Sequence, residues 1–246
     1  GKSVHDAKLM YDKLIKNNKV KYCMNVGIDA KVYHLDENIL ESDLINLINE
    51  LNEDETITGI ILQSPIPKHL DFDKCSSLIK QNKDVDGFTK ENVYNLYLNR
   101  KNILPCTVKG IIKLLEHYNI QIEGANIAIV GRGNIVGKPL ALALENKNAT
   151  VTLCHSKTKN LEKITKNADI LVAAVGKANM ITKDMVKAGA VLVDVGVSKI
   201  DGKIIGDIDK KAYEAASYFT PNPGGVGPMT VAMIIDNLVE MKEGER

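Results

Sequence analysis

The sequence contains no tryptophan and only three phenylalanines among its 246 residues. So few aromatic side chains give little support to a stacking platform for single-stranded nucleic acid. Residues of the two charge signs are nearly equal in number, with 32 Lys and Arg against 31 Asp and Glu. The resulting net charge of +1 argues against general nucleic-acid binding, which requires a clustered excess of basic residues.

Long apolar segments are also missing. No run of about 18 apolar residues occurs, so we expect no membrane-spanning helix. The first residues, 1–5, lack the apolar core of a signal peptide. Hydrophobic residues make up 44% of the chain and charged residues 26%, which is ordinary for a globular protein and excludes a mainly disordered one.

The cysteines are few and lie far apart in the sequence, without a C-x-x-C pair. Zinc sites need closely spaced ligands, and the five histidines show no H-E-x-x-H spacing, so we expect no metal site. Isolated thiols are typical of a reducing cytosol, which makes the cytoplasm the expected location. The cysteines are Cys23, Cys75, Cys106 and Cys154.

The second half of the chain alternates regularly between short apolar runs and helical patterns. Such alternation predicts βαβ units and a parallel sheet. The expected strands are 126–130, 150–154, 170–175 and 191–195, and the expected helices between them are 136–145, 161–166 and 183–187.

The first half alternates less regularly. Apolar spacing predicts strands at 30–35 and 59–63 and helices at 44–51, 107–118 and 231–238. We therefore expect an α/β protein of two lobes, joined by the helix that begins near Thr107 and by the C-terminal helix.

A glycine-rich turn follows the first strand of the regular half. Gly131, Gly133 and Gly137 give the spacing G-x-G-x-x-x-G, one residue longer than the usual dinucleotide fingerprint. Between a strand and a helix, such a turn lets backbone approach phosphate and points helix N–H groups toward it. A purely structural strand–helix turn is the alternative. A Walker A phosphate-binding loop is excluded because Pro139 stands where that motif needs Ser or Thr.

The end of the next strand indicates which dinucleotide fits. NAD sites usually place Asp or Glu there to bind the ribose hydroxyls, but the segment His155-Ser156-Lys157 contains no acid. A hydroxyl and a cation here, with Arg132 in the glycine turn, suit the 2′-phosphate of NADP. The sequence therefore favours NADP over NAD, ordinary loop polarity being the alternative.

Five motifs occur in one order along the chain, and together they are familiar. The chain resembles the bifunctional methylenetetrahydrofolate dehydrogenase/cyclohydrolase (FolD) family from about residue 19 to residue 238. The motifs are Lys83-Asp-Val-Asp-Gly-Phe88, Pro105-Cys-Thr107, Val130-Gly-Arg132 with Val136-Gly137 and Pro139, Cys154-His-Ser-Lys-Thr158, and Pro223-Gly-Gly-Val-Gly-Pro-Met-Thr230.

The resemblance implies two successive reactions in one cleft. Methylenetetrahydrofolate loses a hydride to NADP+ and becomes the methenyl cation, which water then opens to 10-formyltetrahydrofolate. It also implies a folate-binding catalytic domain over 1–108 plus 226–246 and a Rossmann-type NADP-binding domain over 109–225. Members of the family are usually homodimers.

Matching the motifs assigns roles to single residues. Lys19 resembles the family's catalytic lysine, Gln63 the glutamine that holds its amine, and Asp86 the aspartate that binds the pterin ring. Gln63 and Asp86 are thus expected to contact substrate, together with Pro223, Gly224 and Gly225, whereas Asp84 is expected to have a structural role in its turn. The residues expected to bind the cofactor are Thr107, Gly131, Arg132, Gly133, Ile135, Val136, Gly137, His155, Ser156, Val175, Gly176 and Val197.

One departure from the family pattern lies before Lys19. Family members carry an apolar strand and a Tyr-x-x-x-Lys motif here, but Ile15 stands four residues before Lys19. We expect the missing segment to belong to the protein, because losing a central strand would leave two strand edges unpaired. A dehydrogenase with little cyclohydrolase activity and a non-catalytic NADP-binding relative are the alternatives. Retention of Lys19, Gln63 and Asp86 weighs against the second.

Overall fold

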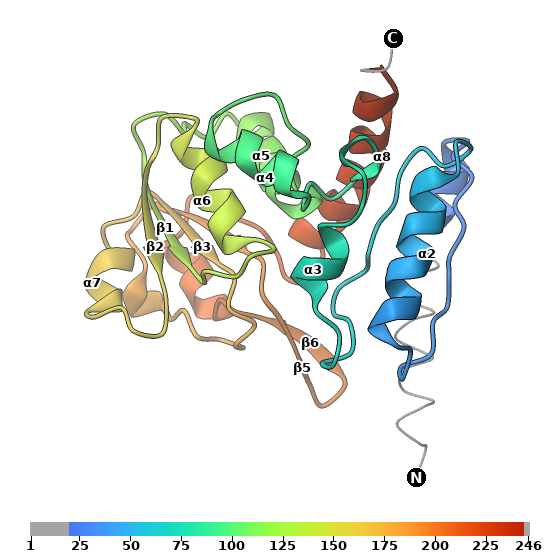
Figure 1. The fold of residues 1–246 in the computed structure, drawn as a ribbon. Coiled ribbons are helices and arrows are strands. Elements are labelled where there is room, and N and C mark those ends of the chain that lie inside the picture. Colours follow the sequence, from blue (N-terminus) through green and yellow to red (C-terminus); the bar gives the residue numbers. More distant parts are fainter. Residues whose placement is uncertain (1–19, 244–246) are drawn as a thin grey trace.

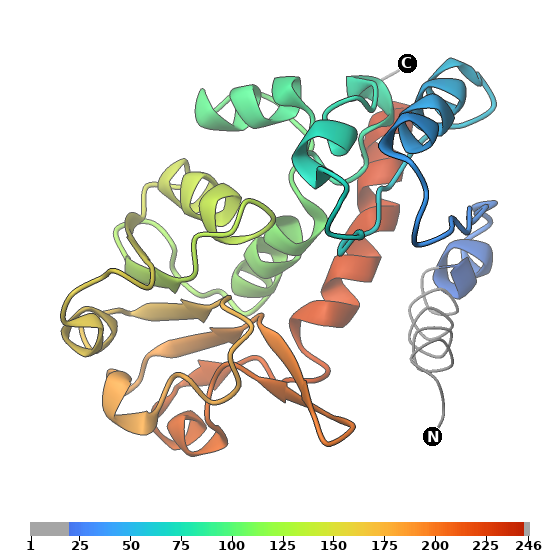
Figure 2. The same ribbon diagram turned by 60° about the horizontal axis from the view of Figure 1, so that its bottom comes forward.

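The computed structural model describes residues 20–243, which fold into two lobes (Figure 1). A sheet lobe contains the strands β1–β3, and a mostly helical N-terminal lobe contains α2 (Glu41–Glu53). The long helix α8 (Val226–Glu243) runs between them, and Figure 2 shows it leaving the sheet lobe toward the N-terminal lobe.

The sheet lobe confirms the parallel sheet predicted from the alternating pattern. In the described part of the chain, five strands pair in the order β2-β1-β3-β4-β7, and every pair is parallel. The strands are β1 (Asn126–Val130), β2 (Thr150–Cys154), β3 (Ile170–Ala173), β4 (Val191–Asp194) and β7 (Tyr218–Phe219).

Both faces of this sheet are covered, because alternate residues of each strand point to opposite sides. Ile127 and Ile129 of β1 pack beneath α5 (Cys106–His117) and α6 (Gly137–Glu145) in one cluster. Ala128 and Val130 belong to a second cluster on the other face. That face is covered by α7 (Leu161–Thr165) and two 3-10 turns, η2 (Lys183–Met185) and η3 (Lys210–Ala215).

An antiparallel hairpin that the sequence analysis did not predict lies beside the sheet. Strands β5 (Val197–Ile200) and β6 (Lys203–Gly206) are joined by Asp201-Gly202, both with positive φ. This dipeptide is a strong hairpin signal because two-residue hairpin turns need left-handed backbone. The signal was present in the sequence and was missed.

In the N-terminal lobe, two predicted strands are wrong. Residues 30–35 are not a strand, and the segment 59–63 contributes a single parallel bridge between Ile60 and Asp84. A strand persists only where a neighbour supplies hydrogen bonds along its length, and no such neighbour flanks 30–35 among residues 20–243. The lobe also contains a helical segment at 20–25, α3 (Phe72–Ser76) and η1 (Gln81–Lys83). The helix α4 (Lys90–Tyr97) follows, and its Leu96 packs in the cluster beneath α6.

Lys83 fixes the end of α2. Its buried ammonium donates hydrogen bonds to the carbonyls of Leu51, Asn52 and Asp54 at 3.0, 2.8 and 2.7 Å. These carbonyls lie at the C-terminal end of α2, where the last turn lacks partners of its own and the helix dipole favours a cation. The Asp-Val-Asp-Gly loop after Lys83 is therefore anchored to α2.

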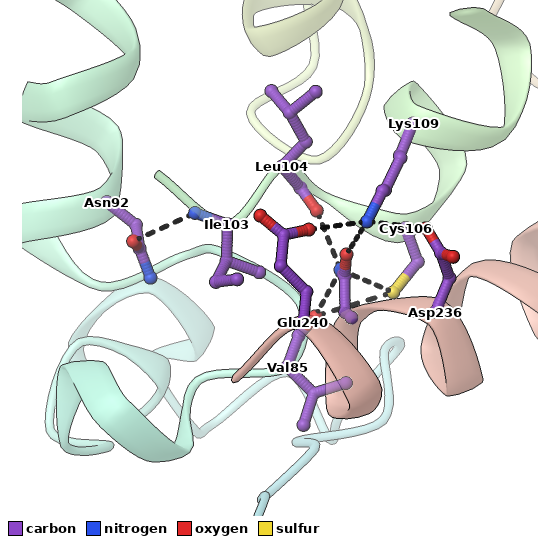
Figure 3. A network of polar contacts seen from close by, with 9 residues as sticks. Val85, Asn92, Ile103, Leu104, Cys106, Lys109, Asp236 and Glu240 are labelled. Atoms are coloured by element: carbon purple, nitrogen blue, oxygen red, sulfur yellow. Dashed lines mark hydrogen bonds and ion pairs between the residues drawn. The ribbon is translucent and has the colours of Figure 1, made fainter. Parts of the chain in front are cut away.

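Helices α5 and α8 pack closely and join the lobes. Gly110 of α5 allows the approach, since a Cβ there would lie 3.1 Å from the Cβ of Met229 in α8. The buried amide of Asn237 in α8 donates to the carbonyls of Val85 and Leu104, at 2.8 and 3.0 Å, and accepts from Lys109 at 2.8 Å (Figure 3).

Replacing Lys83 by Met should destabilise the fold by about 2–3 kcal/mol, because three helix-end carbonyls would lose a charged donor in a buried place. Urea unfolding measures this change. The matched control is Lys80→Met, whose ammonium pairs with Glu53 on the surface. That change should stay within about 0.5 kcal/mol. Equal losses in the two variants would contradict the assigned role of Lys83.

Candidate active site

The glycine turn lies at the carboxyl end of β1, between β2 and β3, where the order of the sheet reverses. Ligands of open parallel sheets bind at this edge and at such a reversal. Gly131 has a φ of +121°, and a Cβ on it would overlap the carbonyl oxygen of Ala174. A Cβ on Gly137 would in turn overlap the carbonyl of Gly131. Both glycines are thus required by close backbone contacts.

The turn leads directly into the N-terminus of α6. Residues 131–141 contain no Asp or Glu, so no acidic side chain of this segment neutralises the positive end of the helix. Arg132, Gly133 and Ile135 are exposed and Val136 is half-buried. Apart from its chain neighbours, no described residue has an atom within 4 Å of a Cβ placed on Gly133, so the position leaves room for a ligand. This arrangement can bind a phosphate group.

The end of β2 brings a cation to the same edge. The N–H of Gly131 donates to the carbonyl of Cys154 at 3.0 Å, which holds the two strand ends together. Beyond Cys154 the chain turns through hydrogen bonds from the N–H of His155 to Thr158 Oγ1, at 2.8 Å, and from the N–H of Lys157 to His155 Nδ1, at 3.2 Å. Ser156 and Lys157 are left exposed beside the glycine turn.

The loop after β3 completes this edge of the sheet lobe. Val175 and Gly176 are exposed, and Gly176 has a φ of +68°. The hydroxyl of Ser198, which follows the exposed Val197 on the hairpin, donates to the carbonyl of Gly176 at 3.1 Å. The loop is also held from below by the fully buried Asp207.

Two buried aspartates of this edge were missed by the sequence analysis. Asp207 accepts backbone N–H groups of the loop after β3, and Asp194, at the end of β4, accepts those of Asp207 and Ile208. Burial raises the pKa of Asp194, although its hydrogen bonds act in the opposite direction. Burial and the neighbouring Asp194 also raise the pKa of Tyr213 to about 12. For Asp194, its position at the end of the apolar run 191–193 was the available signal.

In the N-terminal lobe, Gln63 and Asp86 extend from neighbouring segments. The parallel bridge between Ile60 and Asp84 directs both segments toward the same end. Gln63 is exposed and its amide donates to the carbonyl of Ser64 at 2.7 Å, whereas Asp86 is half-buried.

The conformation of the loop that carries Asp86 is set by Asp84. One buried oxygen of Asp84 accepts from the N–H of Thr89, at 2.7 Å, and from Asn92 Nδ2, at 2.8 Å. Asp84 therefore has the structural role that was expected of it. Gly87 is required here as well, since a Cβ would overlap the carbonyl of Ile103.

The remaining expected site residues lie where the lobes meet. The loop 223–225 immediately precedes α8, and Gly224 has a φ of +110°. The hydroxyl of Thr107, in the first turn of α5, lies 3.1 Å from that of Thr230 in α8. Lys19 falls outside the described residues. A contact between Asn134 Nδ2 of the glycine turn and Asp73 Oδ2 of α3, at 2.9 Å, bridges the lobes.

Residues 20–243 lack both a metal-binding cluster and a membrane-spanning helix. They contain no group of three or more His, Cys, Asp or Glu side chains placed to hold a metal ion. None of their helices is both long and apolar enough to cross a membrane.

Comparison with known proteins agrees with this geometry. The family described as tetrahydrofolate dehydrogenase/cyclohydrolase matches through its catalytic domain over residues 10–86 and through its NAD(P)-binding domain over residues 105–246. The bifunctional protein FolD of Clostridium novyi is 54% identical over 224 residues, which are 91% of this chain and 81% of that protein.

Solved structures give the same result. The bifunctional FolD enzyme of Campylobacter jejuni has a TM-score of 0.92 and 44% identity, covering 96% of this chain and 85% of its own. The Trypanosoma brucei dehydrogenase-cyclohydrolase, solved with NADP and an inhibitor, has a TM-score of 0.90 and 34% identity, covering 96% and 84%. The resemblance read from the sequence motifs is confirmed: the chain belongs to the tetrahydrofolate dehydrogenase/cyclohydrolase family.

Proposed function

We propose that the chain oxidises 5,10-methylenetetrahydrofolate to the methenyl compound with NADP+ and hydrolyses that product to 10-formyltetrahydrofolate. The observation that carries this function is the family match over both domains, with 54% identity to a bifunctional FolD protein. Neither the dehydrogenase-only alternative nor the non-catalytic one has an observation in its favour.

NADP fits the edge of the sheet lobe. When bound, it supplies the hydride acceptor of the oxidation. The exposed turn from Gly131 to Gly137 offers backbone N–H groups and a helix N-terminus to the pyrophosphate. The exposed Arg132, Ser156 and Lys157 offer two cations and a hydroxyl to the 2′-phosphate, and residues 155–157 contain no acid. A relative solved with NADP supports this assignment.

Residues of the proposed folate-binding domain bind the pterin ring and carry out the proton transfers. In this proposal the carboxylate of Asp86 accepts N–H bonds from the pterin ring, and the amide of Gln63 holds the amine of Lys19. A neutral amine can relay the protons of the attacking water. Because a free lysine has a pKa near 10.4, neighbouring groups must lower the pKa of Lys19 for this role at neutral pH.

The two proposed domains correspond to the two lobes. We assign the folate-binding catalytic domain to 1–108 plus 226–246 and the NADP-binding domain to 109–225. The location of the glycine turn and of the Asp86 loop on opposite lobes supports this division.

We also propose that the protein is a cytoplasmic homodimer, as is usual for the family. The exposed Ile200 and Ile204 on the β5–β6 hairpin provide apolar surface that a second copy can bury. Light scattering should give the mass of two chains, and the mass of one chain at micromolar concentration would contradict the proposal.

The function is tested by incubating purified protein with methylenetetrahydrofolate and NADP+, with NAD+ in a parallel reaction. We expect NADPH and 10-formyltetrahydrofolate to form together. Accumulation of the methenyl compound beside NADPH would favour the dehydrogenase-only alternative. Absence of turnover with either cofactor would contradict the proposed enzyme.

Replacing Lys19 by Ala should abolish hydrolysis of added methenyltetrahydrofolate, because the amine that relays protons is lost. The loss of methenyl absorbance over time measures this step. The control is Lys21→Ala, two residues further along, which should hydrolyse the compound at the original rate. Hydrolysis at the original rate in Lys19→Ala would remove the role assigned to Lys19.

Replacing Arg132 by Ala should weaken NADP+ binding about tenfold while changing NAD+ binding much less, because only NADP+ carries the 2′-phosphate. Calorimetric titration with each dinucleotide measures the two affinities. Arg100→Ala, an exposed arginine of the other lobe, serves as the matched control. Equal losses for both dinucleotides in Arg132→Ala would contradict the 2′-phosphate assignment.

A further inference from the structure

Asp207 occupies an unusual place beneath the loop that follows β3. Its side chain is fully buried. Among the described residues, three consecutive backbone N–H groups converge on it. Val175 and Gly176 donate to Oδ2 at 2.6 and 3.0 Å, and Lys177 donates to Oδ1 at 2.7 Å. Two carboxylate oxygens that only accept hydrogen bonds match three donors, a match that an amide side chain does not offer.

The surroundings leave room for a carboxylate in this position. A Cβ on Gly196 would overlap the Asp207 carboxylate, and a Cβ on Gly206 would overlap the carboxylate of Asp194. Both glycines therefore admit an acidic group at close range. The arrangement brings two carboxyl groups into the interior, where their oxygens must be satisfied by hydrogen bonds.

Asp194 holds Asp207 in its place. Its two oxygens accept the N–H groups of Asp207, at 2.9 Å, and Ile208, at 3.2 Å. The side chain of Asn222 hydrogen-bonds to Asp194 and also donates to the carbonyl of Gly196 at 2.7 Å. A continuous chain of hydrogen bonds thus runs from the segment before Pro223 through Asp194 and Asp207 to the loop after β3.

This loop contacts the glycine turn directly. The space that a Cβ on Gly131 would need is filled by the carbonyl of Ala174 and, at 3.3 Å, by Cγ1 of Val175. The loop cannot move without disturbing the turn that faces the pyrophosphate. Its position therefore matters to any ligand that spans the carboxyl edge from β1 to β3.

We propose that Asp207 is the positioning residue of the dinucleotide site, which it shapes by holding the backbone of Val175, Gly176 and Lys177. The inference rests on the proposed NADP-dependent function and extends it to a residue that makes no contact with solvent. Asp207 acts through the loop and not by touching the cofactor. Its loss should therefore weaken the binding of NADP+ more than the use of folate.

The test compares Asp207→Asn with a matched variant at the opposite edge of the sheet. Asp169 also accepts a backbone N–H, from Asn126 at 2.9 Å, but it lies at the amino end of β3. Calorimetric titration with NADP+ measures the dissociation constant, and the dehydrogenase assay gives the KM for each substrate. Circular dichroism and thermal unfolding establish that each variant is folded.

We expect Asp207→Asn to raise the NADP+ dissociation constant about tenfold, the order expected when a buried backbone donor loses its acceptor. Its KM for NADP+ should rise in parallel, while its KM for methylenetetrahydrofolate changes less than about twofold. Asp169→Asn should lower thermal stability without changing the NADP+ dissociation constant by more than about twofold.

Two results would overturn the inference. One is a folded Asp207→Asn protein that binds NADP+ as the unmodified protein does. The other is an equal rise in the KM values for NADP+ and folate, which indicates general disorder of the cleft. If Asp207→Asn does not fold, Ser198→Ala takes its place in the NADP+ titration. This change removes the hydrogen bond from the hairpin residue Ser198 to the carbonyl of Gly176, which holds the same loop. An unchanged NADP+ dissociation constant in Ser198→Ala would then contradict the inference, and a raised one would support it. Failure of the unmodified protein to bind NADP+ would instead contradict the proposed function.

Discussion

The contact between the two described lobes is organised around one buried amide, that of Asn237 in α8. Its nitrogen donates hydrogen bonds to the carbonyls of Val85 and Leu104, and its oxygen accepts one from the ammonium of Lys109. This ammonium also forms ion pairs with Asp236 and Glu240. An unsatisfied amide in this interior position is costly, so these backbone segments are held together. Val85 belongs to the loop that carries Asp86, and Lys109 belongs to the helix α5 that packs on the sheet. One side chain therefore fixes the Asp86 loop relative to the dinucleotide lobe.

Buried and exposed acids have different tasks in this protein. Asp84, Asp194 and Asp207 are buried, and each accepts backbone N–H groups that fix the shape of a loop. Asp86 lies on a loop of this kind but remains partly accessible, as the ligand-binding role proposed for it requires. The same pattern divides the basic residues, since Lys83 and Lys109 bind protein groups whereas Arg132 and Lys157 face solvent. Rigid supports thus hold the polar groups available to ligands.

The sequence alone predicted the parallel sheet well, because strands such as 170–173 are buried on both faces and alternate with helical patterns. It failed at 30–35, since alternation of apolar residues reveals a period but not the partner that a strand requires. The glycine spacing after a predicted strand located the turn at 131–137, and the family motifs led to the role proposed for Asp86. They did not reveal Asp207, whose contacts reach residues about 30 positions away and leave no local pattern. Long-range polar contacts of this kind become evident only once the fold is known.

Hydrogen–deuterium exchange with and without NADP+ is the most direct test of a dinucleotide site at the carboxyl edge of the sheet. It follows the backbone amides that we propose the dinucleotide contacts. We expect saturating NADP+ to slow exchange in residues 131–137 and 154–158. We expect a smaller change in 175–177, whose amides are already bonded to Asp207. Slower exchange elsewhere in the chain, with 131–137 unchanged, would contradict a dinucleotide site at the carboxyl edge of the sheet.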